Sequence, residues 1–373
     1  MIETPPTRNG IGGEDAPWHR RLVDWFRSHR RLLPWRNRPT PYRVWVSEIM
    51  LQQTRVETAR DYFERFITRF PSPEDLARAD SQDVLRVWEG LGYYSRARNL
   101  HRAARRVMEK YDGRIPSTRD ELLTLPGIGE YTAGAIASIA FGAPEPAVDG
   151  NAVRVMARFH ALELDSRKNE IRRRVHERLR EVLTRNDPGD FNQALMELGA
   201  LVCKPRSPDC PVCPLRPDCL AFAQGRTQEL PIRSPRAAVP RHNVAVGVVW
   251  HENRLLIARR PADRMLGGLW EFPGGKQEAG EELPHTVRRE VREEVGLDVT
   301  VGPRLCTVKH AYTHFRVTIS AFTCTAETPD AVAQDAAEVR WVKLDEMEAY
   351  PFPRANRRII EHIKEAGPPK LGA

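Results

Sequence analysis

Residues 117–142, "STRDELLTLPGIGEYTAGAIASIAFG", have the pattern of a short helix, a tight turn and an apolar, alanine-rich helix. Thr118 and Glu121 are spaced as a capping box that begins the first helix. Gly127 and Gly129 allow the turn to approach another molecule closely, and the free amides at a helix start attract anions such as phosphate. The stretch predicts a helix, a hairpin and a second helix, whose free amides can bind a phosphate, such as one of a DNA backbone, without reading any base sequence. A plain turn between two helices would give the same pattern.

Helical periodicity continues on both sides of this hairpin. Between residues 18 and 222, segments such as "PYRVWVSEIMLQQTRVETARDYFERF" and "FNQALMELGALV" carry apolar residues at three- and four-residue spacing. Residues 225–242 contain several prolines and basic residues without a period, which indicates a linker. Strand-like runs such as "VAVGVVW" and "RVTISAFTC" follow, together with one charged helix. We therefore predict an all-α domain over residues 14–224, a linker over 225–242 and an α+β domain over 243–368.

The overall composition narrows the class of protein. The chain has 373 residues, which is enough for two domains that each bury a core. Its formal net charge of +8 favours a polyanionic partner, but many basic proteins bind no nucleic acid. No apolar run reaches about 18 residues, and the N-terminus lacks the basic-then-apolar order of a secretory signal. We therefore expect no membrane span and no secretion, and the clustered cysteines described next favour the reducing cytosol.

Four of the six cysteines lie close together in a proline-rich loop, residues 203–219. They are Cys203, Cys210, Cys213 and Cys219, with the spacing Cys-x6-Cys-x2-Cys-x5-Cys. A disulfide framework would spread its cysteines through a small domain, so this cluster in a large chain indicates a metal site. Four thiolates suit either tetrahedral zinc or an iron–sulfur cluster. We favour the iron–sulfur cluster, because zinc sites usually use two close pairs and only Cys210 and Cys213 form one.

Two carboxylate residues lie in sequence surroundings that would suit a catalytic role. Glu48 lies in the apolar run "VWVSEIML", where burial would raise its pKa and let it hold a proton. The alternative for Glu48 is a solvated carboxylate on a helix surface. Asp149 lies in "AVDGNAVRV", just before another helix, where an aspartate commonly serves only as an N-cap. The local pattern alone leaves both alternatives open.

A glutamate-rich helix in the second domain carries a separate signal. Residues 275–297 have the pattern Gly-x5-Glu-x7-Arg-Glu-Val-x-Glu-Glu-x-Gly-Leu, a complete Nudix box, which is the signature of MutT-type pyrophosphohydrolases. Glu290, Glu293 and Glu294 share one helix face and would suit a hard cation such as Mg²⁺. The alternative is that these residues serve helix packing and salt bridges.

The order of these motifs resembles a known family over about the first 220 residues. The hairpin, the helix, Asp149 and the cysteine loop resemble the endonuclease III-like helix-hairpin-helix DNA glycosylases. Within that superfamily, "SEIMLQQT", "LGYYSRARNLH", "YTAGAI" and "FNQALMELGALVC" are similar to the adenine DNA glycosylases. The resemblance implies a multidomain fold: an all-α helix-hairpin-helix glycosylase domain with a [4Fe-4S] loop, then an α+β Nudix-like domain.

The resemblance also assigns catalytic roles. It makes Glu48 the acid that protonates adenine and later the base toward water, while Asp149 stabilises positive charge on the deoxyribose. Tyr131 and Asn151 support these carboxylates. Bifunctional lyases of the superfamily carry a lysine at the position of Tyr131, because an amine can form a Schiff base with the sugar. Tyrosine therefore implies a monofunctional glycosylase that leaves the DNA strand intact.

DNA binding and base extrusion involve a further set of residues in the family. An enzyme that acts on a paired base must first take it out of the duplex. By resemblance, Gln53 and Tyr93 enter the gap that the extruded base leaves, and Leu51 and Thr54 lie beside them. Arg36 and Gln193 surround the adenine pocket. The hairpin binds the DNA backbone through Gly127 and Gly129.

The second domain of this family recognises 8-oxoguanine opposite the adenine, through a Phe-Ser-His loop. Here "AYTHF" offers Tyr312, Thr313 and His314 instead. Typical family members have lost the Nudix box, so its survival here leaves residual pyrophosphohydrolase activity on oxidised nucleotides as an alternative. We favour a lesion reader that needs no hydrolysis.

The resemblance finally implies a partner and a location. The expected partner is double-stranded DNA with an A:8-oxoguanine or A:G mispair, bound by a monomer in the bacterial cytoplasm, in association with the nucleoid. Two further functions would also fit a DNA-binding chain of this kind, namely a lyase, which Tyr131 disfavours, and a lesion binder without catalytic activity.

Overall fold

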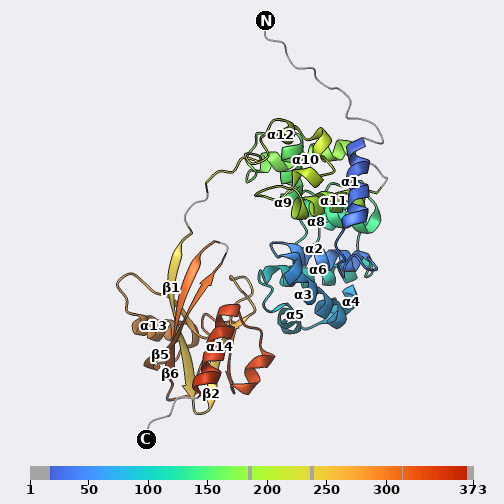
Figure 1. Ribbon diagram of the computed structural model, residues 1–373. Helices are drawn as coiled ribbons and strands as arrows, with labels where there is room; N and C mark the ends of the chain where they lie inside the picture. The colour runs from blue at the N-terminus through green and yellow to red at the C-terminus, as the bar shows by residue number, and fades with distance from the viewer. Residues whose placement is uncertain (1–16, 184–186, 236–238, 313, 368–373) are drawn as a thin grey trace. The chain divides into compact units, whose positions relative to one another are not determined.

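The chain forms two compact units in the computed structural model, which describes residues 17–183, 187–235, 239–312 and 314–367 (Figure 1). The first unit comprises Met1–Ala77 and Arg102–Arg236, and the second comprises Arg78–His101 and Ala237–Ala373. The domain boundaries at 224 and 243 stay a prediction. None of the described helices combines the length and the apolar character needed to cross a membrane.

The first unit is helical. Its core gathers large aromatic side chains of three helices, such as Phe26, Phe159 and Phe191, because each helix turns one apolar stripe inward. The helices are α1 (Pro17–His29), α2 (Pro41–Leu51), α3 (Val56–Arg69), α4 (Pro73–Arg78), α7 (Arg119–Leu123), α8 (Glu130–Phe141), α9 (Gly150–Phe159), α10 (Asn169–Val182), α11 (Pro188–Leu201) and α12 (Leu220–Ala223). Helix α5 (Ser81–Trp88) belongs to the second unit, and α6 (Ser95–Tyr111) is divided between the two.

Helices α7 and α8 form the predicted helix-hairpin-helix. The Thr118 hydroxyl caps α7 by accepting from the Glu121 amide at 3.4 Å, and it also donates to the Glu121 carboxylate at 2.7 Å. Gly127 turns the chain with a φ of 82°. A Cβ on Gly134 would lie 2.1 Å from the carbonyl oxygen of Pro146. Only glycine therefore lets the segment that leads into α9 pack directly on α8.

The second unit is built on a mixed sheet. Its strands run in the order β3-β2-β1-β6-β5, with β4 paired to β1 and β7 paired to β2. Strands β1 and β6 are parallel, and the other pairs are antiparallel. The elements are β1 (Arg241–His251), β2 (Arg254–Arg259), β3 (Trp270–Glu271), β4 (Gly274–Lys276), α13 (Leu283–Val295), β5 (Thr300–Ala311), β6 (Arg316–Thr325), β7 (Glu338–Val342) and α14 (Arg354–Ala366).

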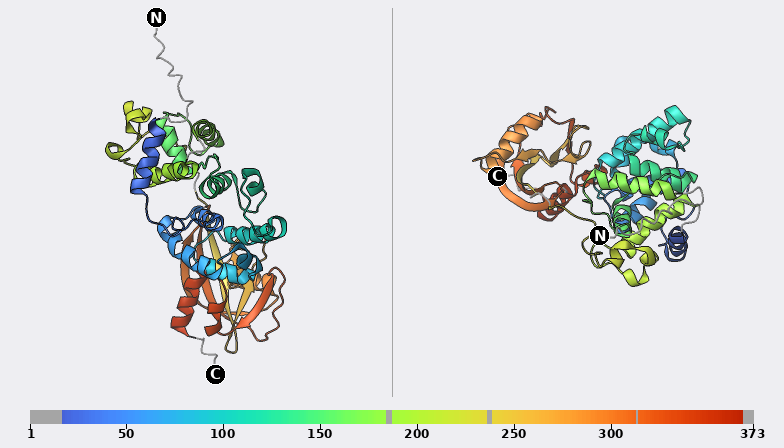
Figure 2. Two further views of the ribbon diagram at one scale, coloured as in Figure 1. Left: turned by 90° about the vertical axis from the view of Figure 1, so that its right-hand side faces the viewer. Right: turned by 90° about the horizontal axis from the view of Figure 1, so that it is seen from above.

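Helices α13 and α14 cover opposite faces of this sheet (Figures 1 and 2). The alternation along β1 explains why both faces are apolar. Val246, Val248 and Trp250 pack in the core with α14, while Ala245 and Val249 pack in the core with α13. The two units confirm the predicted fold class, an all-α unit with a helix-hairpin-helix followed by an α+β unit.

The beginning of the predicted linker packs against the first unit. Leu230 is only 1% exposed, and its carbonyl accepts a hydrogen bond from Arg158 Nε at 2.8 Å. The Ser166 amide donates to the Ile232 carbonyl at 2.9 Å. Residues up to Ile232 therefore have defined partners in the helical unit.

Candidate active site

Glu48 is a buried carboxyl group on α2. The helix begins at the Thr40 cap, whose hydroxyl accepts from the Arg43 amide, and its apolar neighbours leave Glu48 only 6% exposed. The Tyr131 hydroxyl donates to Glu48 Oε2 at 2.7 Å. Burial raises the pKa of Glu48 to about 7, against the hydrogen bond from Tyr131. Glu48 can therefore hold a proton near neutral pH.

Asp149 is the N-cap of α9. Its Oδ1 accepts from the Ala152 amide at 2.7 Å, and its Oδ2 accepts from Asn151 Nδ2 at 2.8 Å. Burial raises the pKa of Asp149, while these hydrogen bonds oppose the rise by stabilising the charged form. The capping role and a buried, oriented carboxylate therefore occur together in one residue.

The two carboxylates line one cavity of about 560 Å³ in the first unit. The cavity lies between α2, α8, the start of α9 and α11. Eight residues singled out from the sequence line it, namely Arg36, Glu48, Leu51, Thr54, Tyr131, Asp149, Asn151 and Gln193. A volume of this size accommodates a small organic ligand such as a nucleobase. The arrangement offers a proton donor and an acceptor of positive charge to one bound group.

The cavity also contains residues that sequence reasoning missed. Arg31, Trp35, Met196 and Glu197 line it as well. Glu197 accepts hydrogen bonds from both Arg31 and Arg36. Glu197 follows Gln193 by one helical turn in "FNQALMELG", which is the only sequence signal that could have pointed to it.

Arg154 of α9 connects the cavity to the cysteine loop. Its Nη2 donates to Asn151 Oδ1 at 2.7 Å and to the Gly199 carbonyl at 2.6 Å. Its Nε donates to the Cys203 carbonyl at 2.8 Å. Together with the bond from Asn151 to Asp149, these contacts fix the orientation of Asp149 from a distance.

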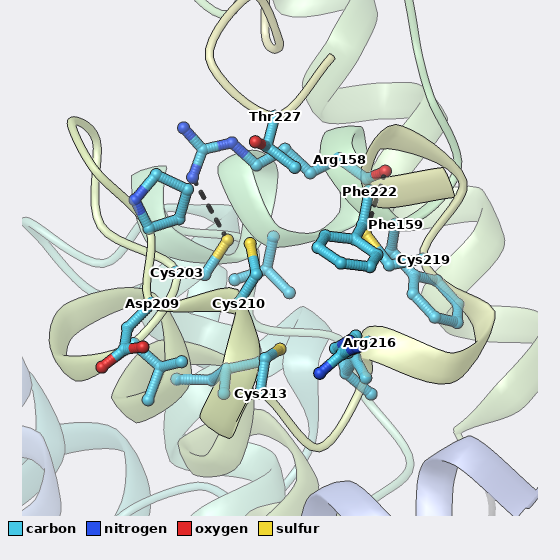
Figure 3. A pocket seen from close by; sticks show the side chains of 15 residues that line it. Arg158, Phe159, Cys203, Asp209, Cys210, Cys213, Arg216, Cys219, Phe222 and Thr227 are labelled. Carbon is cyan, nitrogen blue, oxygen red and sulfur yellow. Dashed lines mark hydrogen bonds between the residues drawn. The ribbon is translucent and has the colours of Figure 1, made fainter. Parts of the chain in front are cut away.

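The four cysteines of the predicted metal loop line a second cavity (Figure 3). Arg158 Nη1 donates to Cys203 Sγ at 3.3 Å, marked in Figure 3 by the dashed line between these two residues. Among the described residues, no three or more His, Cys, Asp or Glu side chains are arranged to hold one metal ion. In a [4Fe-4S] cluster each thiolate binds a different iron, so the thiols need not meet at one atom. This donor set, on one cavity, therefore fits the cluster. Burial raises the pKa of Cys213 to about 12, so a bound metal would be needed to hold it as thiolate.

Gln53 and Tyr93, the predicted wedge residues, both have left-handed backbones. Their φ values are 57° and 50°, and Tyr93 is 39% exposed. Such conformations cost energy in residues other than glycine and often mark functional positions. The two residues belong to different compact units, so their joint action stays a prediction.

The glutamates of the Nudix box form ion pairs and hydrogen bonds with other residues of the chain. Arg289 pairs with Glu281, Glu290 and Glu293, and Glu294 accepts from the Gly274 amide at 3.0 Å. Burial and the neighbouring Glu271 raise the pKa of Glu294. These contacts do not support the predicted Mg²⁺ site, and they agree with the alternative of helix packing and salt bridges.

The predicted lesion-reading residues follow β5. Tyr312 is partly buried between His310 and Phe315, at ring-centroid distances of 4.6 and 4.9 Å. His314 is exposed. Thr313 lies outside the described residues. The lesion-reading role of these three residues stays a prediction.

Each half of the chain is similar to a known protein family. Residues 46–181 match the HhH-GPD superfamily of base excision DNA repair proteins, and residues 245–362 match the NUDIX domain. Among solved structures, a thermostable thymine-DNA glycosylase superposes with a TM-score of 0.51 at 28% identity, covering 56% of this chain and 95% of that one.

Curated relatives extend this match along the whole chain. The adenine DNA glycosylase of Buchnera aphidicola (strain APS) is 29% identical, over 92% of this chain and 97% of that protein. The adenine DNA glycosylase of the rat, Rattus norvegicus, is 33% identical, over 98% of this chain and 82% of its own length. Because this similarity spans both the helical and the Nudix-like parts, the chain belongs to the adenine DNA glycosylase family, and it is a DNA N-glycosylase.

Proposed function

We propose that this enzyme excises adenine mispaired with 8-oxoguanine or guanine in duplex DNA, as a monofunctional glycosylase of base excision repair. The observation that carries the proposal is the pairing of Glu48 and Asp149 on one cavity. Cleavage of an N-glycosidic bond needs a proton for the leaving base and a negative charge near the sugar. The names of the relatives support adenine as the base.

Glu48 supplies the proton. Its pKa of about 7 leaves much of the group protonated at neutral pH, and Tyr131 occupies Oε2 with a hydrogen bond. The proton is therefore available on Oε1, from which it passes to a ring nitrogen of adenine as the bond to the sugar breaks. After the base has left, the Glu48 carboxylate accepts a proton from the attacking water.

Asp149 stabilises the positive charge that develops on the sugar. The Ala152 amide and Asn151 hold its carboxylate in one orientation, so no reorganisation is needed in the transition state. Tyr131 has no amine and a pKa raised by burial, so it stays a neutral hydrogen-bond donor. Without a Schiff base the strand remains uncut.

Other residues of the chain would bind the DNA and bring the adenine to the two carboxylates. We assign backbone binding to the amides at Gly127 and Gly129, and the extrusion of adenine to Gln53 and Tyr93. The net charge of +8 agrees with a double-stranded DNA partner, bound by a monomer. Recognition of 8-oxoguanine is assigned to the loop that carries Tyr312, Thr313 and His314.

The cysteine loop would hold the cofactor. Cys203, Cys210, Cys213 and Cys219 would bind a [4Fe-4S] cluster, which when bound supplies cross-links between the segments of the loop. Arg154 and Arg158 tie this loop to α9 through the Cys203 carbonyl and thiol. Iron and sulfide analysis of the purified protein tests the assignment.

A base-release assay tests the proposed function. We expect free adenine from a duplex with one A:8-oxoguanine pair, slower release from A:G and none from A:T. The strand should stay intact until alkali is added, and borohydride should trap no protein–DNA adduct. A matched duplex with C opposite 8-oxoguanine is the control. Absence of adenine release from the mispaired duplexes, or a trapped adduct, would contradict the proposal.

A further inference from the structure

An ion triad on the wall of the adenine cavity is centred on a buried carboxylate to which the roles above assign nothing. It consists of Glu197 on α11 with Arg31 and Arg36 from the segment between α1 and α2. We infer that Glu197 is a positioning residue, which holds both guanidinium groups on the cavity wall and offsets their charge toward Glu48. The inference rests on the proposed function, because it concerns the same reaction.

The hydrogen bonds of Glu197 show why it acts through other residues. The residue is only 2% exposed. Its Oε1 accepts from the Arg31 amide at 2.9 Å, from Arg31 Nε at 3.0 Å and from Arg36 Nη1 at 3.2 Å. Its Oε2 accepts from Arg31 Nη2 at 3.0 Å and from Arg36 Nη2 at 3.1 Å. A carboxylate has about four lone-pair directions, so none is left for a substrate.

Arg36 in turn positions Gln193, the residue predicted to contact the adenine. Its Nε donates to Gln193 Oε1 at 3.0 Å, and its Nη1 also donates to the Arg31 carbonyl at 3.1 Å. The oxygen of Gln193 therefore accepts from Arg36, and its amide nitrogen donates one hydrogen to the Gly189 carbonyl at 3.3 Å, which leaves its second N–H to contact a base. Loss of Glu197 would release Arg36 and, with it, the orientation of Gln193.

The triad also sets the charge that Glu48 experiences. Two guanidinium groups and one carboxylate leave a net charge of about +1 on this wall. The charge of Arg36 favours the ionised form of Glu48, while Asp149 disfavours it and Tyr131 donates a hydrogen bond to it. Burial alone would raise the pKa of Glu197, but Arg31 and Arg36 outweigh burial and lower it to about 2. Glu197 therefore stays charged at neutral pH.

Other charged groups lie near Arg31 and Arg36 but interact with them less strongly than Glu197 does. Glu57 of α3 lies 3.7 Å from Arg31 Nη1 but is mostly exposed, so water screens its charge. Arg30, Asp187 and Asp190 also line the cavity, and both aspartates pair with Arg27. Glu197 is the buried group that contacts both Arg31 and Arg36.

The test compares Glu197→Gln with the charge-retaining Glu197→Asp, by single-turnover adenine release from an A:8-oxoguanine duplex across pH. The wild-type rate should fall as Glu48 loses its proton with rising pH. Glu197→Gln leaves a wall charge of about +2, which lowers the pKa of Glu48, so the half-point of the fall should move down by roughly one pH unit. Its plateau rate should drop roughly 10- to 100-fold. Glu197→Asp should keep the wild-type half-point even if its plateau rate is lower.

The outcomes separate a positioning role from a structural one and from failure of the proposed function. A purely structural role would lower the rate of both variants without moving either half-point, and would overturn the inference. If Glu197→Gln does not fold, Arg31→Gln removes one positive charge and should move the half-point upward; an unchanged half-point there also overturns it. If the wild type releases no adenine, the proposed function fails and this inference falls with it.

Discussion

Glu48→Gln is expected to lower the single-turnover rate of adenine release by about a thousandfold. Glutamine has nearly the same shape, and its amide oxygen can still accept the hydrogen bond from Tyr131 that Glu48 Oε2 now accepts. It has no proton to transfer, so adenine must leave as a poor leaving group. The wild-type rate should decline above a pH of about 7, because the pKa of Glu48 lies there, and the residual rate of the variant should not follow this decline.

Folding provides the control for this variant. Because burial raises the pKa of Glu48 from 4.5 to about 7, the folded state holds a proton that the unfolded chain loses between these values. Wild-type stability should therefore fall as pH rises through this window, and glutamine has no charge to bury. The thermal midpoint of Glu48→Gln at pH 8 should match or exceed that of the wild type. A folded variant that releases adenine at the wild-type rate would contradict the assigned role, and a thermal midpoint at pH 8 well below that of the wild type would contradict the stability argument.

Asp149→Asn is expected to lower the rate by about 10²- to 10³-fold, through loss of the negative charge beside the sugar. Asparagine is as good an N-cap as aspartate, so α9 should keep its start at the Ala152 amide. The N-cap Asp80 of α5, whose side chain accepts from the Gln82 amide at 2.7 Å, offers a matched control. Asp80→Asn makes the same chemical change outside the lining of the cavity.

Single-turnover rates and circular dichroism of both variants decide between a cap and a catalytic anion. We expect unchanged helix content in both variants and slow adenine release only in Asp149→Asn. Equal rates in the two variants would reduce Asp149 to a helix cap. Loss of helix content with loss of rate would assign the effect to folding.

The local signals in the sequence predicted the fold because they act over a few residues. Thr118 and Glu121 cap one helix, and Gly127 turns the chain, so the helix-hairpin-helix needs no distant partner to be recognised. The alternation along β1 likewise follows from the pleat of a strand. Fold class could therefore be predicted from short-range pattern and from the resemblance.

The interior of the site depends on contacts between distant residues, which no local pattern contains. Arg31 and Glu197 are 166 positions apart in the chain, and Arg36 and Gln193 are 157 apart. The identity of Glu48 and Asp149 came from family motifs, whereas their common cavity required the packing of α2 against α8 and of α8 against the segment before α9. The burial of Leu230 in the predicted linker also depends on distant residues, so the loop-like composition of this segment did not predict it.

The central claim is that Glu48 and Asp149 act on one glycosidic bond in one transition state. A double-variant cycle tests it most directly, by comparing single-turnover adenine release from an A:8-oxoguanine duplex in the wild type, the two single variants and Glu48→Gln combined with Asp149→Asn. Residues that act as a unit are not additive, so the double variant should be within about tenfold of the slower single variant. A double variant whose loss equals the product of the two single losses would contradict the account, because the two carboxylates would then serve independent steps.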